Sequence, residues 1–355
     1  MSESLPRTWR TGAHCRPAAA ATRSRRAASA IKDGSTCTPP WSLPATKSYP
    51  RARSPVDTGP TPPPLHSVTG VATTITITGS GIPMPSPGRA GAGALLRHDD
   101  TLVQVDAGPA TLFRLTEAGV DITRLGALVI THHHSDHLMG IPELVLTRWI
   151  RNGVRPCEAL PIHCPDGPAV GYLESLLDNL EPDIAARVAL AGFPDRPEPA
   201  VHPFQPGTAP AAVATIDEVL VESVLVDHGE IHPAVAYRFI TPDGVVVVSG
   251  DTRACDAVEN LATGADILVH EVLSSRRLLE EGLSARRVEG LAGYHAEAPT
   301  VGALAARAGV RQLVLTHLMP APRGDADEAA LVADVRSGGF DGDVAVGSDL
   351  YTAAV

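Results

Sequence analysis

A dense group of metal-binding residue types begins just after position 131, where the chain reads His-His-His-Ser-Asp-His. In the register His132-x-His134-x-Asp136-His137, four side chains could coordinate a cation. The apolar run over 125–130 predicts a buried strand before them, and the residues that follow favour the start of a helix. At the end of a strand, residues two positions apart point to the same side, so the first two imidazoles could reach one ion.

Imidazole and carboxylate side chains together suit zinc, and also manganese or iron. A lone histidine before a helix is usually an ordinary core or surface residue. Four ligand types within six positions are much harder to explain by packing alone. We therefore interpret residues 132–137 as part of a metal site.

Other predicted strands also end in ligand-type residues. Three further apolar runs lead to such a residue, namely 219–226 to His228, 245–249 to Asp251 and 312–315 to His317. A carboxylate directly after a buried valine run is costly unless it pairs with a cation. Because strand ends gather functional side chains in open αβ layers, we expect these residues to meet the 132–137 cluster at one edge of a sheet.

The remaining pattern predicts a mixed chain of strands and helices. Strands are expected over 72–78, 92–97, 101–105, 160–163, 234–240 and 266–269, the last of which ends at His270-Glu271. Helices are expected over 110–118, 144–150, 170–179 and 300–308, and the Pro-rich segment 193–210 is interpreted as a surface connection. His163 and His202 are interpreted as non-ligands, and Asp106 as either a partner of a metal ligand or a turn residue.

Of 355 residues 44% are apolar, which is enough for a sizeable core.

The net charge differs between the first 67 residues and the rest of the chain. Residues 1–67 carry ten Lys/Arg and three Asp/Glu, a balance of +7, so with a total of −11 residues 68–355 carry −18. Such an acidic body is a poor match for non-specific binding of a long polyanion.

Residues 1–67 show no apolar periodicity and are rich in Arg, Pro, Ser and Ala, which predicts a disordered tail. No apolar segment follows the arginines, so a secretory signal is not expected. An organelle transit peptide would share the arginines but not the prolines. A further interpretation is an upstream extension of a chain whose start lies near Val68. We assign this tail no function and expect one ordered domain over 68–355.

Cysteine usage and hydropathy bear on the compartment. The five cysteines include no CxxC pair, and their odd number disfavours a disulfide framework. No apolar run reaches the ~18 residues of a membrane span. Both features indicate a cytoplasmic protein without a membrane partner.

Several motifs, taken in order, resemble the metallo-β-lactamase superfamily and, within it, the ribonuclease Z-like metallo-hydrolase branch. The resemblance runs from about Val71 to Leu350. It rests on Thr78-Gly-Ser-Gly-Ile-Pro83, Asp106-Ala-Gly108, the 132–137 cluster, Asp227-His-Gly229, Ala236-Tyr-Arg238, Ser249-Gly-Asp-Thr252, His270-Glu271, Tyr294-His295 and Leu315-Thr-His317. It implies an α/β (α+β) fold, a four-layer αββα sandwich, over residues 68–355.

The resemblance also implies a centre of two divalent metal ions, zinc first, with manganese or iron as alternatives. Its metal ligands would be His132, His134 and His228 for one ion, Asp136, His137 and His317 for the other, and Asp251 as a bridge. Two such ions can share a hydroxide that attacks phosphorus or a carbonyl carbon. Asp136 could accept its proton, and His295, oriented by Glu271, would donate to the leaving group or to a substrate oxygen. His232 is a rival to His228 as a ligand.

Two departures from the branch bear on the substrate. In its tRNA 3′-processing enzymes, a long Gly/Pro- and Lys-rich arm that grips tRNA follows the Gly-Tyr-Arg segment, whereas here 237–244 leads straight into the next strand. His295 is followed by Ala-Glu instead of the Ser/Thr pair common in those enzymes. With the acidic body, these departures favour a small-molecule or nucleotide-type substrate over RNA.

The favoured hypothesis is a ribonuclease Z-like phosphodiesterase with a dinuclear centre. An ester or lactone hydrolase with the same centre is an alternative, and no residue in the sequence separates the two. A tRNA 3′-end endonuclease without the arm is another. A non-catalytic metal-binding or redox di-iron protein is disfavoured, because histidines stand where such redox centres usually need an extra carboxylate. The sequence is compatible with a homodimer.

Overall fold

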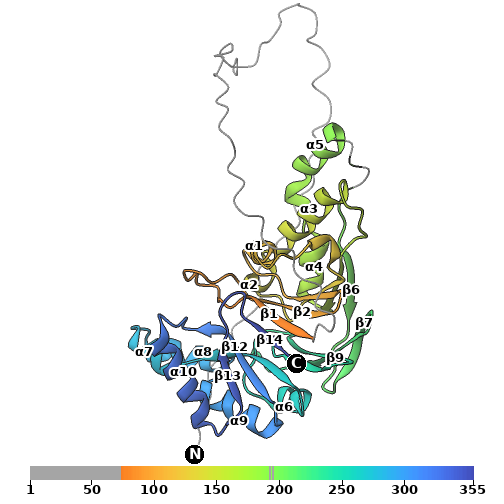
Figure 1. The fold of residues 1–355 in the computed structure, drawn as a ribbon. Helices are drawn as coiled ribbons and strands as arrows, with labels where there is room; N and C mark the ends of the chain where they lie inside the picture. Colours follow the sequence, from red (N-terminus) through yellow and green to blue (C-terminus); the bar gives the residue numbers. More distant parts are fainter. Residues whose placement is uncertain (1–72, 192, 194–195) are drawn as a thin grey trace, which may run out of the picture. The chain divides into compact units, whose positions relative to one another are not determined.

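The computed structural model describes residues 73–191, 193 and 196–355, and the expected tail over residues 1–67 lies outside these ranges. Two seven-stranded sheets form the centre of the described part, and helices cover their outer faces (Figure 1). The predicted four-layer αββα sandwich is therefore confirmed. Among the described residues, no helix has the length and apolar character to cross a membrane.

The first sheet has the strand order β14-β1-β2-β3-β4-β5-β6. Its strands are β1 (Thr74–Gly79), β2 (Gly93–His98), β3 (Thr101–Val105), β4 (Ala127–Val129), β5 (Pro161–Pro165), β6 (Ala200–Phe204) and β14 (Thr352–Ala354). Pairing is antiparallel from β14 to β3 and parallel from β3 to β6. The predicted strands over 92–97 and 101–105 are β2 and β3, which form a hairpin.

The second sheet has the strand order β13-β12-β11-β10-β9-β8-β7. Its strands are β7 (Ala211–Ile216), β8 (Val219–Leu225), β9 (Val235–Thr241), β10 (Gly244–Val248), β11 (Ile267–Leu273), β12 (Gln312–Met319) and β13 (Asp343–Val346). Pairing is antiparallel from β7 to β10 and parallel from β10 to β13. The parallel strands bring their carboxyl ends to one edge.

Helices pack on the sheets in three groups. The first sheet is covered by α1 (Thr111–Glu117), α3 (Ile141–Asn152), α4 (Pro168–Glu174) and α5 (Glu181–Ala191), together with the short α2 (Ser135–Leu138) and the 3₁₀ turns Ile122–Arg124 and Asp178–Leu180. The second sheet is covered by α6 (Asp256–Ala262), α9 (Ala298–Ala308) and α10 (Asp325–Ser337). At the ends of β11 and β12 lie α7 (Ser275–Glu280) and α8 (Ala285–Ala292).

Burial on both faces explains why the strands are apolar without alternation. On β10, Val246 and Val248 belong to the core between the two sheets, whereas Val247 faces the helices outside. On β4, Val129 points to the inner core and Leu128 to the outer one. Central strands such as β4 and β10 therefore carry an apolar residue at nearly every position, as strands covered by two layers require, whereas β1 alternates Thr and Ile.

One predicted loop and two strand ends differ from the sequence prediction. The segment 193–210 contains β6, which pairs in parallel with β5. β6 is an edge strand, and an edge strand tolerates Pro203 although proline has no N–H group to donate. The prolines of this segment were therefore wrongly interpreted as a sign of a surface connection. The strands β11 and β12 also continue beyond the predicted ends, so Glu271 and His317 lie inside strands. Besides β6, eight helices and strands were not predicted, namely α5, α6, α7, α8, α10, β7, β13 and β14.

His317 is placed by a β-bulge in β12. The pairing with β11 runs Glu271 with Thr316 and then Val272 with Leu318, which leaves His317 without a partner in the register. Its φ is +45°, a left-handed value that is uncommon for a residue other than glycine. A bulge redirects the side chain of the extra residue, and here it turns an imidazole away from the sheet plane.

Closely packed glycines fix the turn that carries residues 132–137. A Cβ atom on Gly108 would lie 2.0 Å from the carbonyl oxygen of Asp136 and 2.5 Å from the carbonyl carbon of Gly91. A Cβ on Gly140 would lie 2.2 Å from the carbonyl oxygen of Gly108. Three backbone segments thus approach to a separation that only glycine permits.

We expect the substitution Gly108→Ala to lower the free energy of unfolding by about 1–3 kcal/mol, because the added methyl group must displace backbone. Gly290→Ala is the matched control, since it lies on an exposed helix position with no atom within 4 Å of an added Cβ. It should be neutral or stabilise by up to ~1 kcal/mol. Denaturant titration of both variants measures the free energy of unfolding. Equal values for Gly108→Ala and Gly290→Ala would contradict the close packing of backbone around Gly108.

Candidate metal centre

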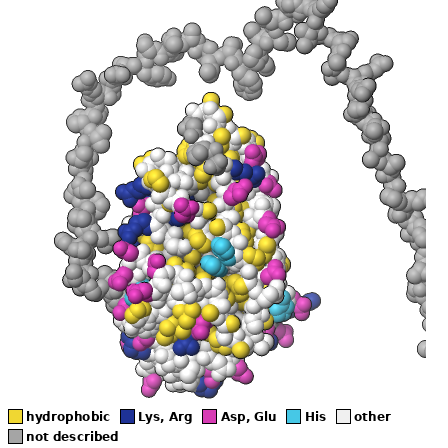
Figure 2. All heavy atoms as spheres, turned by 90° about the vertical axis from the view of Figure 1, so that its right-hand side faces the viewer, with side chains coloured by type: hydrophobic (Ala, Val, Ile, Leu, Met, Phe, Trp, Pro, Cys, Tyr) yellow, Lys and Arg dark blue, Asp and Glu magenta, His cyan; other side chains and the backbone are white. Residues whose placement is uncertain are grey.

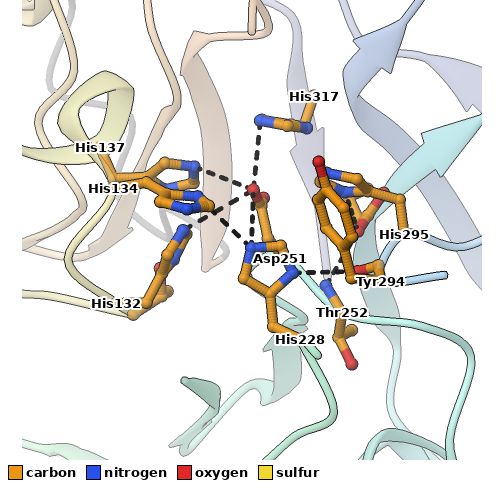
Figure 3. A network of polar contacts seen from close by, with 12 residues as sticks. His132, His134, His137, His228, Asp251, Thr252, Tyr294, His295 and His317 are labelled. Atoms are coloured by element: carbon orange, nitrogen blue, oxygen red, sulfur yellow. Dashed lines mark hydrogen bonds and ion pairs between the residues drawn. The ribbon is translucent and has the colours of Figure 1, made fainter. Parts of the chain in front are cut away.

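The structure brings all seven predicted metal ligands to one edge of the two sheets (Figure 3). His132 and His134 lie between β4 and α2, and Asp136 and His137 belong to α2. From the second sheet come the three others, namely His228 after β8, Asp251 after β10 and His317 from the bulge of β12. The centre is therefore divided between the two sheets.

Asp251 lies between two groups of ligand-type atoms. One group contains His132, His134, His228 and Asp251, and another contains Asp136, His137 and His317, while a third, overlapping group joins Asp251 and His317 with His295; ligand atoms lie within 4.8 Å of one another in each. The Oδ2 atom of Asp251 contacts imidazole nitrogens of the first two groups, at 3.3 Å from His317 Nε2, 3.4 Å from His137 Nε2, 3.7 Å from His132 Nε2 and 3.9 Å from His228 Nε2. One carboxylate thus joins the two groups.

Several buried polar atoms in this cluster have no hydrogen-bond partner among the described residues. They are His132 Nε2, His137 Nε2, Asp136 Oδ1, Asp251 Oδ1 and His317 Nδ1. A buried polar atom without a partner costs about 1–3 kcal/mol. Because imidazole nitrogens and carboxylate oxygens are ligands of divalent transition metals, the residues present fit metal binding.

Burial and charge set the protonation of the cluster. Burial lowers the pKa of His132 well below its ordinary value, and burial followed by the charge of His228 lowers the pKa of His134 to about 4. For Asp251, burial raises the pKa, but His317 and His137 outweigh it and hold the pKa well below its ordinary range. A neutral imidazole and an ionised carboxylate are the forms that bind metal. For His137, burial lowers the pKa, but the charges of Asp251 and Asp106 outweigh it and raise the pKa well above its ordinary value, so metal binding would displace a proton from this imidazole.

Asp106 is a hydrogen-bond partner of His137, on the side of the ring away from the cluster. The sequence had left open whether Asp106 is such a partner or a turn residue. Its Oδ2 atom accepts a hydrogen bond from His137 Nδ1 at 2.7 Å. The same carboxylate accepts bonds from the main-chain N–H of Thr131 at 2.8 Å and from its hydroxyl at 2.7 Å. The contact fixes the tautomer of His137 so that Nε2 faces the cluster.

Two other imidazoles are oriented in the same way. The hydroxyl oxygen of Thr131 accepts a bond from His132 Nδ1 at 3.0 Å, and the carbonyl of Tyr294 accepts one from His228 Nδ1 at 2.9 Å. Sequence reasoning missed both partners. A main-chain carbonyl carries no residue-type signal, and a threonine beside a histidine is too common to be informative.

His295 and Glu271 form a separate pair beside the cluster. Glu271 Oε1 accepts a hydrogen bond from His295 Nδ1 at 2.8 Å and another from the main-chain N–H of Thr252 at 2.8 Å. Burial lowers the pKa of His295, but the charge and hydrogen bond of Glu271 outweigh it and raise the pKa. His295 also lines the cavity above the cluster, so it can deliver a proton there.

The remaining histidines lie elsewhere. His232, the rival of His228, is exposed and belongs to none of the groups of ligand-type atoms. His163 and His202 stack on each other with ring centroids 5.0 Å apart, on the neighbouring strands β5 and β6. Neither belongs to a group of potential metal ligands in the part of the chain that the structure describes.

The chain is similar to known metallo-hydrolases in sequence and in fold. The model of the family described as "Beta-lactamase superfamily domain" matches residues 101–318. The "Ribonuclease Z" of Mycobacterium bovis (strain BCG / Pasteur 1173P2) is 34% identical over 270 residues, which are 75% of this chain and 92% of that protein.

Solved structures give the same fold. A metallo-beta-lactamase fold protein from Bacillus subtilis has a TM-score of 0.62 and 21% identity, with 80% of this chain and 100% of that chain covered. The short form of human tRNase Z has a TM-score of 0.55 and 19% identity, with 79% and 99% covered. At these identities the structural likeness bears on the fold, and the sequence matches bear on the family.

We expect Asp106→Asn to weaken zinc affinity about 10- to 100-fold, because the amide no longer fixes His137 as a neutral ligand with a free Nε2 atom. Asp100→Asn, at an exposed carboxylate that pairs only with Arg124 on the surface, is the control and should bind zinc as the wild type does. Competition with a chromophoric chelator measures both affinities. Equal zinc affinities of the two variants would show that the contact between Asp106 and His137 is not needed for metal binding.

Proposed function

This chain belongs to the ribonuclease Z-like branch of the β-lactamase superfamily, and from that premise we propose that it is a phosphodiesterase with two divalent metal ions around Asp251. It is a metal-dependent hydrolase, and its fold implies that it binds divalent metal. The observation that supports a pair of ions is the position of Asp251 Oδ2, within 3.9 Å of imidazoles from both ligand groups.

The proposed ligand sets follow the two groups. His132, His134 and His228 hold one ion, Asp136, His137 and His317 hold the other, and Asp251 lies between them. Five imidazoles and two carboxylates favour zinc over magnesium or calcium, which prefer oxygen ligands, with manganese or iron as alternatives.

Protein groups supply the proton transfers. When bound, the two ions would supply Lewis-acid stabilisation of the charge that develops on the phosphoryl oxygens and would lower the pKa of a water molecule. Asp136 lines the cavity, and its Oδ1 atom has no hydrogen-bond partner among the described residues, so it can accept a proton from the attacking water. His295, held by Glu271, donates a proton to the leaving oxygen.

The choice of a phosphodiester over a carboxylic ester rests on the relatives. The protein at 34% identity is named for an activity on RNA, whose linkages are phosphodiesters. An ester or lactone hydrolase would use the same centre. Turnover of bis-p-nitrophenyl phosphate, compared with a panel of lactones and aryl esters, separates the two.

A compact substrate is favoured over a long RNA. The hairpin of β9 and β10 pairs Thr241 with Gly244, so only residues 242 and 243 lie between the strands and no arm extends from this position. On the face of the described residues in Figure 2, basic and acidic side chains are interspersed without a continuous basic band. A tRNA 3′-end endonuclease stays the alternative that the relatives' name favours, and cleavage of a precursor tRNA tests it.

We expect Asp251→Ala to reduce turnover of bis-p-nitrophenyl phosphate by at least about 10²-fold, because stabilisation of the transition-state charge is lost. Metal content per chain, measured by mass spectrometry, should fall together with the rate. Asp100→Asn serves again as the surface control. Full metal content and full rate in Asp251→Ala would refute the proposed position of this residue between two ions.

We expect the effect of His295→Gln to depend on the leaving group. For a phenyl ester, whose phenolate needs a proton, kcat should fall about 10²- to 10⁴-fold. For a p-nitrophenyl ester the fall should be much smaller, because that phenolate leaves unprotonated. Metal content should stay unchanged. An equal loss with both esters would mean that His295 acts in some way other than as the acid.

A further inference from the structure

The cavity above the metal centre has one wall that comes mainly from a single segment. Its volume is about 670 Å³, within the usual range for sites that enclose a small ligand. Residues of α7, α8 and their flanks that line it are Leu278, Glu281, Leu283, Arg287, Leu291, Tyr294 and His295. Arg287 and Leu291 are four positions apart on α8, so they lie on the same face of this helix, and Leu283 and Tyr294 flank its two ends.

Most of this wall is apolar. The apolar side chains that line the cavity include Ile82, Met84, Leu278, Leu283, Leu291 and Met319. Leu278 and Met319 are buried in a small core with Val288, and Leu283 and Leu291 pack against it. The apolar surface is therefore continuous with the protein interior, and a ring or chain of a substrate could lie against it.

Three arginines also line the cavity, but only one is available to a ligand. Arg89 donates to the Ser80 hydroxyl at 2.7 Å and to the Gly347 carbonyl at 3.1 Å. Arg323 pairs with Glu281 Oε1 at 2.8 Å. Arg287 is exposed and has no ion pair or hydrogen bond with any residue that the structure describes.

We propose that this cavity selects a compact phosphodiester with two further features, an apolar ring that lies on the α7–α8 wall and a second anionic group that Arg287 binds. The proposal rests on the proposed phosphodiesterase function and names its substrate class. Phosphate and carboxylate are the groups that a guanidinium binds best, through paired N–H donors. The metal centre of the proposed function would hold the phosphodiester group, so Arg287 is left for the second anion.

The test uses two esters that differ by one anionic group, thymidine 5′-(p-nitrophenyl phosphate) with and without a 3′-phosphate. In the metal-loaded wild type, KM should be lower for the ester with the 3′-phosphate. In Arg287→Gln, KM for that ester should rise about 10-fold or more at unchanged kcat, since a bond to a charged group is lost. KM for the other ester should stay nearly the same.

Arg286→Gln is the matched control, because the neighbouring arginine is exposed and does not line the cavity. It should leave both esters unaffected. Leu291→Asn should raise KM for both esters several-fold through loss of apolar contact, whereas Leu279→Asn, at an exposed leucine outside the cavity, should not. Equal KM changes for the two esters in Arg287→Gln, or none, would overturn the proposed role of Arg287.

Calorimetric binding separates failure of this inference from failure of the proposed function. Thymidine 3′,5′-bisphosphate should bind the metal-loaded wild type more tightly than thymidine 5′-monophosphate, and only Arg287→Gln should remove the difference. If this pattern holds while neither ester is cleaved, the phosphodiesterase function is wrong and the anion site stands. If both esters are cleaved but the bisphosphate has no advantage, the anion site is wrong and the function stands.

Discussion

The structure depends on one buried carboxylate, Asp251, which lies among imidazoles where water cannot solvate it. Burying an ionised carboxylate without compensation is prohibitively expensive, so the surrounding groups must supply positive charge. The backbone serves this placement as well. Gly250 has φ +60°, and an added Cβ would lie 2.8 Å from the Val235 carbonyl oxygen and 2.9 Å from Thr131 Cβ. The chain can therefore turn sharply after β10 and place Asp251 against the other sheet.

The two halves of the centre come from different sheets, so its geometry depends on how the sheets pack. Residues 132–137 belong to the first sheet, and His228, Asp251 and His317 belong to the second. Two hydrogen bonds join the sheets just behind the cluster, from the Val235 N–H to the Thr131 carbonyl at 3.0 Å and from the Tyr237 hydroxyl to the Ile130 carbonyl at 2.6 Å. A shared apolar core fixes the rest of the interface.

The proposed chemistry and the proposed substrate selection belong to different parts of the molecule. The ligand-type residues lie on strand ends and on the turn of residues 132–137, which the two sheets hold rigidly. The cavity wall of α7 and α8 lies outside the sandwich layers, where it packs on the ends of β11 and β12 and forms ion pairs with α10. Such peripheral segments can change without disturbing a metal centre, which is how one fold serves different substrates.

The sequence by itself determined the ligand types, because His-x-His-x-Asp-His is a local pattern, and it indicated the αββα class through the resemblance of its motifs to a known superfamily. Tertiary structure decided the rest. It placed His228 in the cluster and left His232 exposed, and it put Asp106 behind His137. It also set the bulge at His317 and left Arg287 without a partner among the described residues. These outcomes depend on contacts between residues far apart in the chain, and no local pattern encodes such contacts.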